Sequence, residues 1–361
     1  MTYRRSILLT VCFGLCIATA YAQTRKTENL IIIGWDGVRW QEIFTGVDSA
    51  VMNDHAFTKR SAAMRAEFWD NDPVVRRKKL LPFFWGTLGQ EGQLYGNRTL
   101  GNKVDVANRW HVTNAGFTET LIGFADSAIN GNHSVPDKNT NVLEFINNQQ
   151  AYKGKVAVFA TSKLYDNILN VKRSRLMINC DSEEVALPGA AFKLLNEEQR
   201  LSPQIFGERL DLVTFFQAKE YLKEYSPRVL YINFSETDNY AHAGSYDWYI
   251  STLHGQERLI ADLWNYIQSV PQYKDKTTLL ISNDHGRGGT KAHWTDHGPS
   301  PVESKEIFIL AIGPDMPPLG EVGTDMQLYQ GQIAATLAKF LGLDYTAEHL
   351  VMPVIPTLFK K

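Results

Sequence analysis

The stretch Leu279-Leu-Ile-Ser-Asn-Asp284-His285-Gly-Arg-Gly-Gly-Thr-Lys-Ala-His293-Trp-Thr-Asp296-His297-Gly298 decides the fold of this chain. Its first part, with the two threonines before it, is a β-branched and leucine-rich run that predicts a buried strand over residues 277–281. Asp284 and His285 follow where this strand ends, and glycines prevent its continuation. Functional side chains of α/β proteins gather at such strand ends, and a carboxylate beside an imidazole suits zinc or manganese. The stretch therefore predicts part of a metal site at the edge of a sheet.

Strands and helices alternate along the rest of the chain. Apolar runs predict further strands at residues 29–34, 155–160, 228–234 and 307–312. Helical periodicity is found at residues 39–51, 142–146, 206–225 and 249–267, and a capping-box pattern, Thr324-x-x-Gln327, predicts a last helix that ends near Leu341. This order predicts an α/β fold with a mainly parallel central sheet and helices on both faces. The irregular residues 161–208 are interpreted as a small cap-like insertion.

The first 22 residues have the pattern of a secretory signal peptide. Arg4 and Arg5 precede an apolar run, and Ala20-Tyr21-Ala22 fits a cleavage site. We therefore expect an exported protein, periplasmic or extracellular, whose residues 23–361 form a single domain. No later run approaches the roughly 20 apolar residues of a membrane span.

Charge and cysteine content exclude some classes of protein. Removing the signal peptide changes the formal net charge from −2 to −4, which argues against a nucleic-acid-binding surface. Cys180 is then the one remaining cysteine, so no internal disulfide can form, and we interpret it as a buried residue.

Other strand ends add ligands of the same kind. Asp36 follows the strand at 29–34, and Asp238 follows the strand at 228–234, with His242 one helical turn later. His297 comes from the opening stretch. Because the ends of parallel strands share one edge, these side chains should meet there, and together they suffice for two cations with three protein ligands each. The set comprises Asp36, Asp238, His242, Asp284, His285 and His297.

Thr113 precedes a short helical segment that closes at Gly123. Helix N-termini favour anions, so its hydroxyl is a candidate nucleophile, although threonine is also an ordinary helix cap. Gly116, in the first turn, is expected to let phosphate oxygens approach closely.

Taken together, these motifs resemble the alkaline phosphatase superfamily, most closely its nucleotide pyrophosphatase/phosphodiesterase branch. The resemblance spans about Asn29 to Leu341. It implies that Asp238, His242 and His297 hold one metal ion and that Asp36, Asp284 and His285 hold the other. It also implies that Thr113, at the second ion, attacks the phosphorus of a phosphoric ester and forms a covalent intermediate. The expected cofactors are two divalent ions, zinc first and manganese second, and the partner is a small phosphoric ester.

The residues that hold the phosphate are less well defined. The candidates are Asn114, beside the nucleophile, the loop residues Asn132 and Asn139, and Arg39. Asn130, Asn141 and Lys163 are further alternatives.

The sequence is also compared with what other functions on this fold would require. Diesters are favoured over monoesters, because no evident cluster of basic residues awaits a dianion. A sulfatase would need Cys or Ser followed by Pro and Arg at the nucleophile, which Thr113-Asn-Ala-Gly-Phe117 does not supply. A phosphoglycerate mutase of the same superfamily would need a large inserted domain. A non-catalytic metal- or phosphate-binding protein on the same fold is the alternative from a different class.

Overall fold

The computed structural model describes residues 25–132 and 135–360, so the expected signal peptide lies outside the described residues. Within the described chain, one eight-stranded sheet has the order β10-β2-β9-β7-β1-β6-β4-β5. Its parallel part comprises β7 (Thr277–Asn283), β1 (Asn29–Trp35), β6 (Val229–Phe234), β4 (Val156–Ala160) and β5 (Met177–Cys180). β9 (Ile309–Ile312) is antiparallel to both its neighbours, β7 and β2 (Gln93–Tyr95). The short β10 (Gly320–Glu321) pairs parallel with β2.

The central strands are buried along their whole length. Every residue of β1, β6 and β7 is buried, as expected for parallel strands covered on both faces. Side chains alternate between the two faces, so that Ile31 and Ile33 join one hydrophobic cluster while Leu30 and Ile32 join the other. This explains why these segments read as continuous apolar runs in the sequence.

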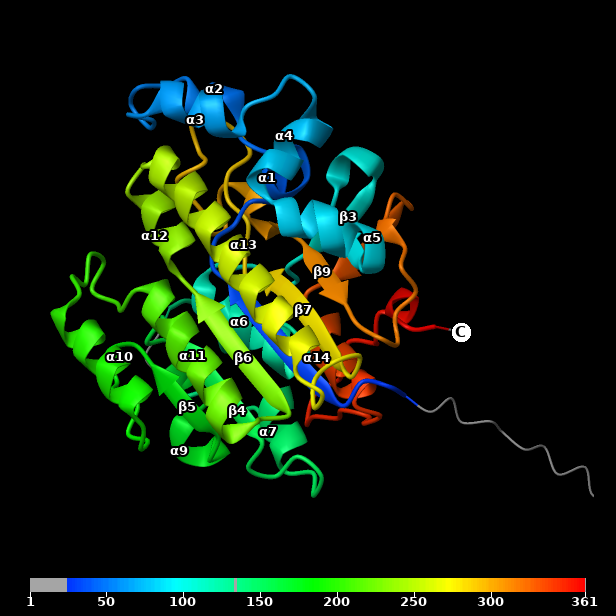
Figure 1. Ribbon diagram of the computed structural model, residues 1–361. Coiled ribbons are helices and arrows are strands. Elements are labelled where there is room, and N and C mark those ends of the chain that lie inside the picture. The colour runs from blue at the N-terminus through cyan, green and yellow to red at the C-terminus, as the bar shows by residue number, and fades with distance from the viewer. Residues whose placement is uncertain (1–24, 133–134, 361) are drawn as a thin grey trace, which may run out of the picture.

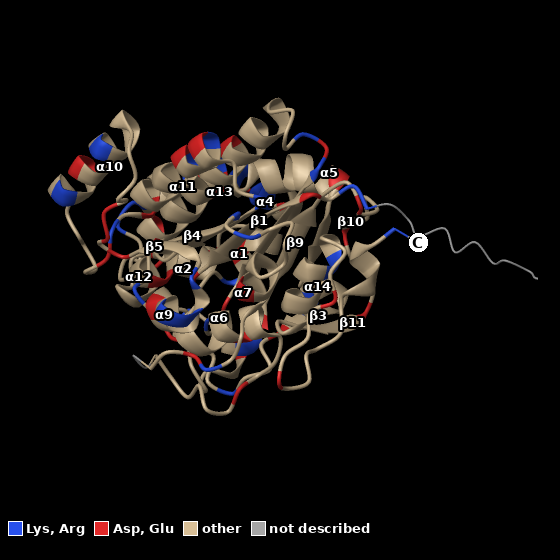
Figure 2. Ribbon diagram, turned by 90° about the horizontal axis from the view of Figure 1, so that it is seen from below, with Lys and Arg blue, Asp and Glu red and all other residues tan. Residues whose placement is uncertain are grey.

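Helices complete the two outer layers (Figures 1 and 2). α11 (Asp211–Tyr225) and α13 (Tyr246–Ser269) pack on the face of Ile31. α6 (Thr113–Ile122), α7 (Val142–Asn147) and α14 (Gln332–Phe340) pack on the face of Leu30. The predicted architecture, a mainly parallel sheet between helical layers, is confirmed.

Shorter elements fill the connections. Residues between β1 and β2 form α1 (Trp40–Thr45), α2 (Ser49–Met52), α3 (Ser61–Phe68), α4 (Pro73–Leu80), the π-helix η1 (Phe84–Leu88) and α5 (Gly89–Glu91). Later connections contain α8 (Tyr165–Ile168), α9 (Val171–Ser174), α10 (Ala190–Leu201), α12 (Glu236–His242) and the 3₁₀ helices η2 (Arg98–Leu100), η3 (Val302–Lys305) and η4 (Pro356–Leu358).

Two expectations about local structure need correction. The capping-box pattern at Thr324 does not start the last helix, because β11 (Met326–Tyr329) pairs there with β3 (Asn102–Asp105) in a second sheet that also contains β8 (Glu306–Ile307). The expected cap over residues 161–208 mostly extends the main fold instead. Within it, β5 is the edge strand of the large sheet and α10 packs on α11.

None of the helices among the described residues is long and apolar enough to cross a membrane. Cys180 is buried, as expected.

Candidate metal centre

The six predicted ligands meet at the carboxyl ends of β6, β1 and β7, which are neighbours in the sheet. Asp36 directly follows β1, Asp238 and His242 lie one turn apart on α12 after β6, and Asp284 and His285 follow β7. They form two groups of three, and His297 joins Asp238 and His242 from a loop. Within each group the candidate ligand atoms all lie within 4.8 Å of one another.

The group of Asp36, Asp284 and His285 is almost completely shielded from solvent. His285 Nε2 lies 3.2 Å from Asp284 Oδ2 and 3.5 Å from Asp36 Oδ1. His285 Nδ1 is 3.0 Å from the carbonyl of Gly286, which can only accept, so this nitrogen carries the proton and Nε2 presents a lone pair. Asp284 Oδ2 and His285 Nε2 are buried without hydrogen-bond partners among the described residues. A cation between these two atoms would satisfy both of them.

The group of Asp238, His242 and His297 is more open. The Nε2 atoms of the two histidines lie 2.9 Å apart, and His242 Nε2 is 3.1 Å from Asp238 Oδ2. His297 Nδ1 donates to the carbonyl of His111 at 2.9 Å, which again directs an Nε2 lone pair into the group. The rings of His285 and His297 stack with centroids 3.9 Å apart, so the two groups lie side by side.

The charges of the first group explain why it suits a cation. Burial, together with the charges of Asp284 and Asp238, raises the pKa of Asp36 well above its ordinary value. Burial and the Asp238 charge raise the pKa of Asp284 to about 8. Burial lowers the pKa of His285, so its imidazole is neutral, which is the form that binds metals. The protein alone therefore disfavours two ionised carboxylates here, and a bound cation would reverse that preference.

Arg287 is a residue at the site that the sequence interpretation missed. Its buried guanidinium contacts Asp238 Oδ1 and donates to the carbonyls of Trp294, at 3.0 Å, and Thr295. Burial alone would raise the pKa of Asp238, but the charge of Arg287, together with the contacts of His242 and His297, holds that pKa well below its usual range. The signal in the sequence is an arginine two residues after His285, close enough along the chain to serve as a counter-charge to the carboxylates.

Gly37 shows how closely the chain is packed around these carboxylates. Its φ is +62°, and a Cβ added there would lie 2.2 Å from Asp238 Oδ1. Its N–H donates to Asp284 Oδ1 at 3.1 Å. A glycine is therefore required both for the backbone conformation and for the approach of the two carboxylates.

Thr113 is the first residue of α6 and only 5% exposed. Its hydroxyl donates to Asp36 Oδ1 at 3.5 Å, and the side chain does not cap the helix, whose N-cap is Val112. The expectation that Gly116 lets phosphate oxygens approach is wrong. An added Cβ would lie 2.2 Å from the carbonyl oxygen of Asp284, so Gly116 faces the end of β7. Its role is to let α6 approach the end of β7.

Of the candidate phosphate-binding residues, two lie beside Thr113 and two are engaged by carboxylates elsewhere. Asn132 Oδ1 accepts from the N–H of Asn114 at 2.9 Å, and Asn114 Nδ2 donates to the carbonyl of Gly131 at 2.9 Å, both beside Thr113. Asn139 donates to Asp126 and Asp137 and so supports the loop. The Arg39 guanidinium is fully buried against Glu42, which does not support its assignment to phosphate binding.

The surroundings of Asn141 and Lys163 do not support a role in phosphate binding. Asn141 caps α7, because its Oδ1 accepts from the N–H of Glu144 at 2.9 Å. Lys163 is exposed on the loop after β4.

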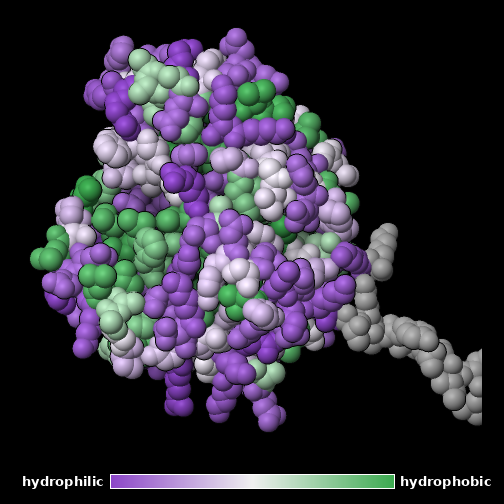
Figure 3. Space-filling model, in the orientation of Figure 1, coloured by the Kyte–Doolittle hydropathy of each residue, from purple (hydrophilic) through white to green (hydrophobic). Residues whose placement is uncertain are grey.

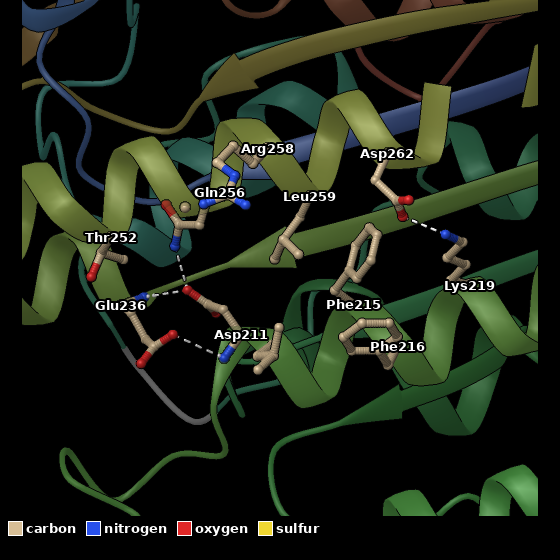
Figure 4. Close-up of a pocket in the computed structure, with 12 residues that line it drawn as sticks. Asp211, Phe215, Phe216, Lys219, Glu236, Thr252, Gln256, Arg258, Leu259 and Asp262 are labelled. Atoms are coloured by element: carbon tan, nitrogen blue, oxygen red, sulfur yellow. Dashed lines mark hydrogen bonds and ion pairs between the residues drawn. The ribbon is translucent and has the colours of Figure 1, made fainter. Parts of the chain in front are cut away.

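A buried carboxylate on α11 fixes the helix that carries Asp238 and His242 (Figure 4). Asp211 accepts from the N–H groups of Ser235 and Glu236, both at 2.9 Å, and thereby caps α12. Gln256 of α13 donates to Asp211 and accepts from the indole N–H of Trp35, the residue before Asp36. A single network thus connects the first and second ligand-bearing segments.

This network forms the floor of a groove of about 480 Å³ between α11 and α13. Its walls include Leu212, Phe215, Phe216 and Leu259, and hydrophobic residues gather on this face of the molecule (Figure 3). The groove contributes none of the six candidate ligands.

Comparison with solved structures identifies the fold, whereas no family model and no curated protein matches the sequence. The structure of alkaline phosphatase PafA superimposes with a TM-score of 0.60 at 10% identity, covering 93% of this chain and 99% of that one. Lipoteichoic acid synthase LtaP from Listeria monocytogenes gives 0.59 at 11% identity, covering 92% and 76%. A putative sulfatase from Bacteroides thetaiotaomicron gives 0.58 at 12% identity, covering 92% and 74%.

The chain has the alkaline phosphatase fold. The predicted resemblance to the alkaline phosphatase superfamily is confirmed at this level. A phosphatase, a synthase and a putative sulfatase share the fold, so the reaction has to be argued from the site itself.

Replacing His242 with Ala should remove one metal ion and leave the other. The Asp238 group would keep two ligands, whereas the Asp36 group is unchanged. The zinc content, measured by elemental analysis after dialysis against zinc, should fall from about two ions per chain to about one. His293→Ala is the matched control, because its side chain is 62% exposed and outside both groups. Equal losses from the two variants would contradict the assignment.

Replacing Asp211 with Asn should destabilise the protein and loosen α12. The amide would present a donor to backbone donors, at a cost of about 1–3 kcal/mol in the free energy of unfolding, measured with urea. Asp262→Asn, in the same groove but paired with Lys219 at the surface, should change it by less than about 0.5 kcal/mol. A loss of stability that is no larger for Asp211→Asn than for Asp262→Asn would refute the bracing role.

Proposed function

We propose that this protein is an exported hydrolase of phosphoric esters that uses two divalent metal ions and Thr113 as its nucleophile. One observation carries the proposal: a buried threonine hydroxyl, at the start of a helix, lies 3.5 Å from a carboxylate of one three-ligand group while a second such group adjoins it. The apparent signal peptide supports export.

The two groups fit the proposed metals by their chemistry. Each combines carboxylate and imidazole in a set of three, which suits zinc best and manganese next and leaves coordination positions open. Asp36, Asp284 and His285 would hold one ion and Asp238, His242 and His297 the other. Such ions favour the ionised form of a nearby hydroxyl and offset charge on phosphoryl and departing oxygens.

The chain itself would position the reacting groups. Thr113 O–H points toward Asp36, and α6 begins at Thr113, so the helix N-terminus lies where phosphate oxygens would gather. Attack by the Thr113 oxygen on phosphorus would expel the alcohol and leave a phosphothreonine ester, which water would then hydrolyse. The side chains of Asn114 and Asn132, at the same helix end, are the candidates for holding a non-bridging oxygen.

Diesters are the favoured substrates, and monoesters are the alternative. A monoester would bring a second negative charge that calls for cationic side chains at the phosphate. The buried guanidiniums of Arg39 and Arg287 are engaged by Glu42 and Asp238. This pairing supports a monoanionic diester, as does the resemblance to the phosphodiesterase branch.

An activity panel tests the class of substrate. Metal-depleted protein should be inactive on aryl phosphate monoesters, aryl phosphate diesters and aryl sulfates, and zinc should restore hydrolysis of the diester above all. A monoester rate far above the diester rate, with the same leaving group, would reverse the preference. Hydrolysis of the sulfate alone would reject the proposed function.

Thr113→Ala should abolish turnover by several orders of magnitude while folding and metal content are kept, because the covalent route is lost. Thr113→Ser keeps a hydroxyl and should retain measurable activity. Thr118→Ala is the control, since the Thr118 hydroxyl is directed at Asn114 Oδ1, 3.4 Å away, and its loss should be mild. If Thr113→Ala remains active, attack does not pass through Thr113.

A further inference from the structure

A cationic shelf borders the Asp238 group on the side of His297. We use "shelf" for the cavity of about 660 Å³ lined by Val106, Ala107, Asn108, Arg109, Trp110, His111, Pro299 and Lys305. This lining includes an arginine and a lysine and no carboxylate. The net charge of the chain is negative, so the shelf is a local exception that would attract anions.

Neither cation of the shelf is strongly engaged by an acid. The Arg109 guanidinium lies 4.6 Å from the centroid of the Trp110 ring and has no ion pair with any described residue. Lys305 Nζ is 3.7 Å from Asp105 Oδ2, a long contact, and Asp105 is already in close contact with Arg98. Both cations are therefore available to a ligand.

The backbone of the shelf is fixed to the proposed catalytic machinery. His111 has a φ of +47°, and its carbonyl accepts from His297 while its Nδ1 donates to the carbonyl of Gly298 at 3.1 Å. Asn108 Oδ1 accepts from the N–H groups of Trp110 and His111. Glu119 of α6 accepts from the N–H of Asn108 at 2.8 Å. The shelf is thus preorganised relative to both His297 and the helix that begins at Thr113.

The direction of the proposed reaction leads to this shelf. Phosphoryl transfer places the attacking and departing oxygens roughly in line. Thr113 lies beside Asp36, so the nucleophile belongs to the group of Asp36, Asp284 and His285. The departing oxygen would then face the group that contains His297, and whatever that oxygen carries would extend toward the shelf, whose His111 carbonyl accepts from His297.

We propose that the shelf binds the departing group of the substrate, and that this group carries a negative charge of its own as a carboxylate, sulfate or phosphate. This inference rests on the proposed function for the direction of the reaction. Arg109 and Lys305 act as specificity-determining residues that contact the anion, and they take no part in bond making or breaking.

Two methyl phosphate diesters test this inference, with nitrophenol leaving groups that differ only in a carboxylate or the matching carboxamide. The wild-type protein should favour the carboxylate in kcat/KM by about tenfold at low salt, as expected for two partly exposed ion pairs. Arg109→Ala and Lys305→Ala should each reduce this preference, and the double variant should abolish it. Turnover of the carboxamide diester should change by less than about twofold, and added salt should weaken the preference.

Lys193→Ala is the matched control. Lys193 is exposed on α10, at the opposite side of the molecule from β3 and the shelf, and its loss should leave the preference unchanged (Figures 1 and 2). Equal wild-type rates for the two diesters, or a preference that survives in the double variant, would overturn the inference while the proposed function stands.

Binding of the free nitrophenols, measured by calorimetry, separates the inference from the proposed function. If the wild-type protein hydrolyses neither diester, the shelf is judged by binding alone, and the proposed function fails when aryl phosphate monoesters are not hydrolysed either. Tighter binding of the carboxylate than of the carboxamide, lost in the double variant, supports the shelf; equal binding overturns it. Sulfate- and phosphate-bearing phenols then show which anion binds best.

Discussion

Repulsion between buried carboxylates is the constraint on which the site depends. Asp36, Asp238 and Asp284 are each at most 8% exposed and meet at one edge of the sheet. The structure reduces this repulsion in two ways. At Asp238 it supplies a counter-charge in Arg287, and that carboxylate stays ionised. At Asp36 and Asp284 no guanidinium or ammonium contacts either carboxylate among the described residues, and burial raises both pKa values. The unneutralised pair is therefore the part of the site that most requires a cation.

The surrounding fold holds this unfavourable arrangement in place. β1, β6 and β7 are hydrogen-bonded neighbours, so the segments that follow them cannot separate. Asp211 then caps α12, and Gln256 connects that cap to Trp35. The rings of His285 and His297 are oriented by carbonyls at Nδ1. Rigid elements and a second layer of hydrogen bonds therefore position the ligands, and the apolar layers stabilise the frame around them.

Most of the fold could be predicted from the sequence because its core strands are continuous apolar runs. The same runs indicated where the six candidate ligands meet, since a polar residue after a buried strand lies at a sheet edge. Long-range pairing could not be predicted in this way: residues 326–329 look like the start of a helix until β3 pairs with them. Arg287 and Asp211 were missed for a related reason. Their roles depend on partners 49 and 24 to 25 residues away, which no local pattern contains.

The low sequence identity to proteins of the same fold follows from the difference between the apolar core and the polar strand ends. In the sheet and its helices, each core position needs only an apolar side chain that points into one of the two clusters, around Leu30 or around Ile31. Several residue types meet this need, so the sequence there is free to change. At the strand ends the proposed function makes the requirement chemical: an oxygen or nitrogen ligand at a fixed point, a glycine where Asp238 approaches Gly37, and a hydroxyl at the start of α6. Few residue types meet each of these needs. A fold can therefore be shared at 10% identity while a handful of positions still indicates the chemistry.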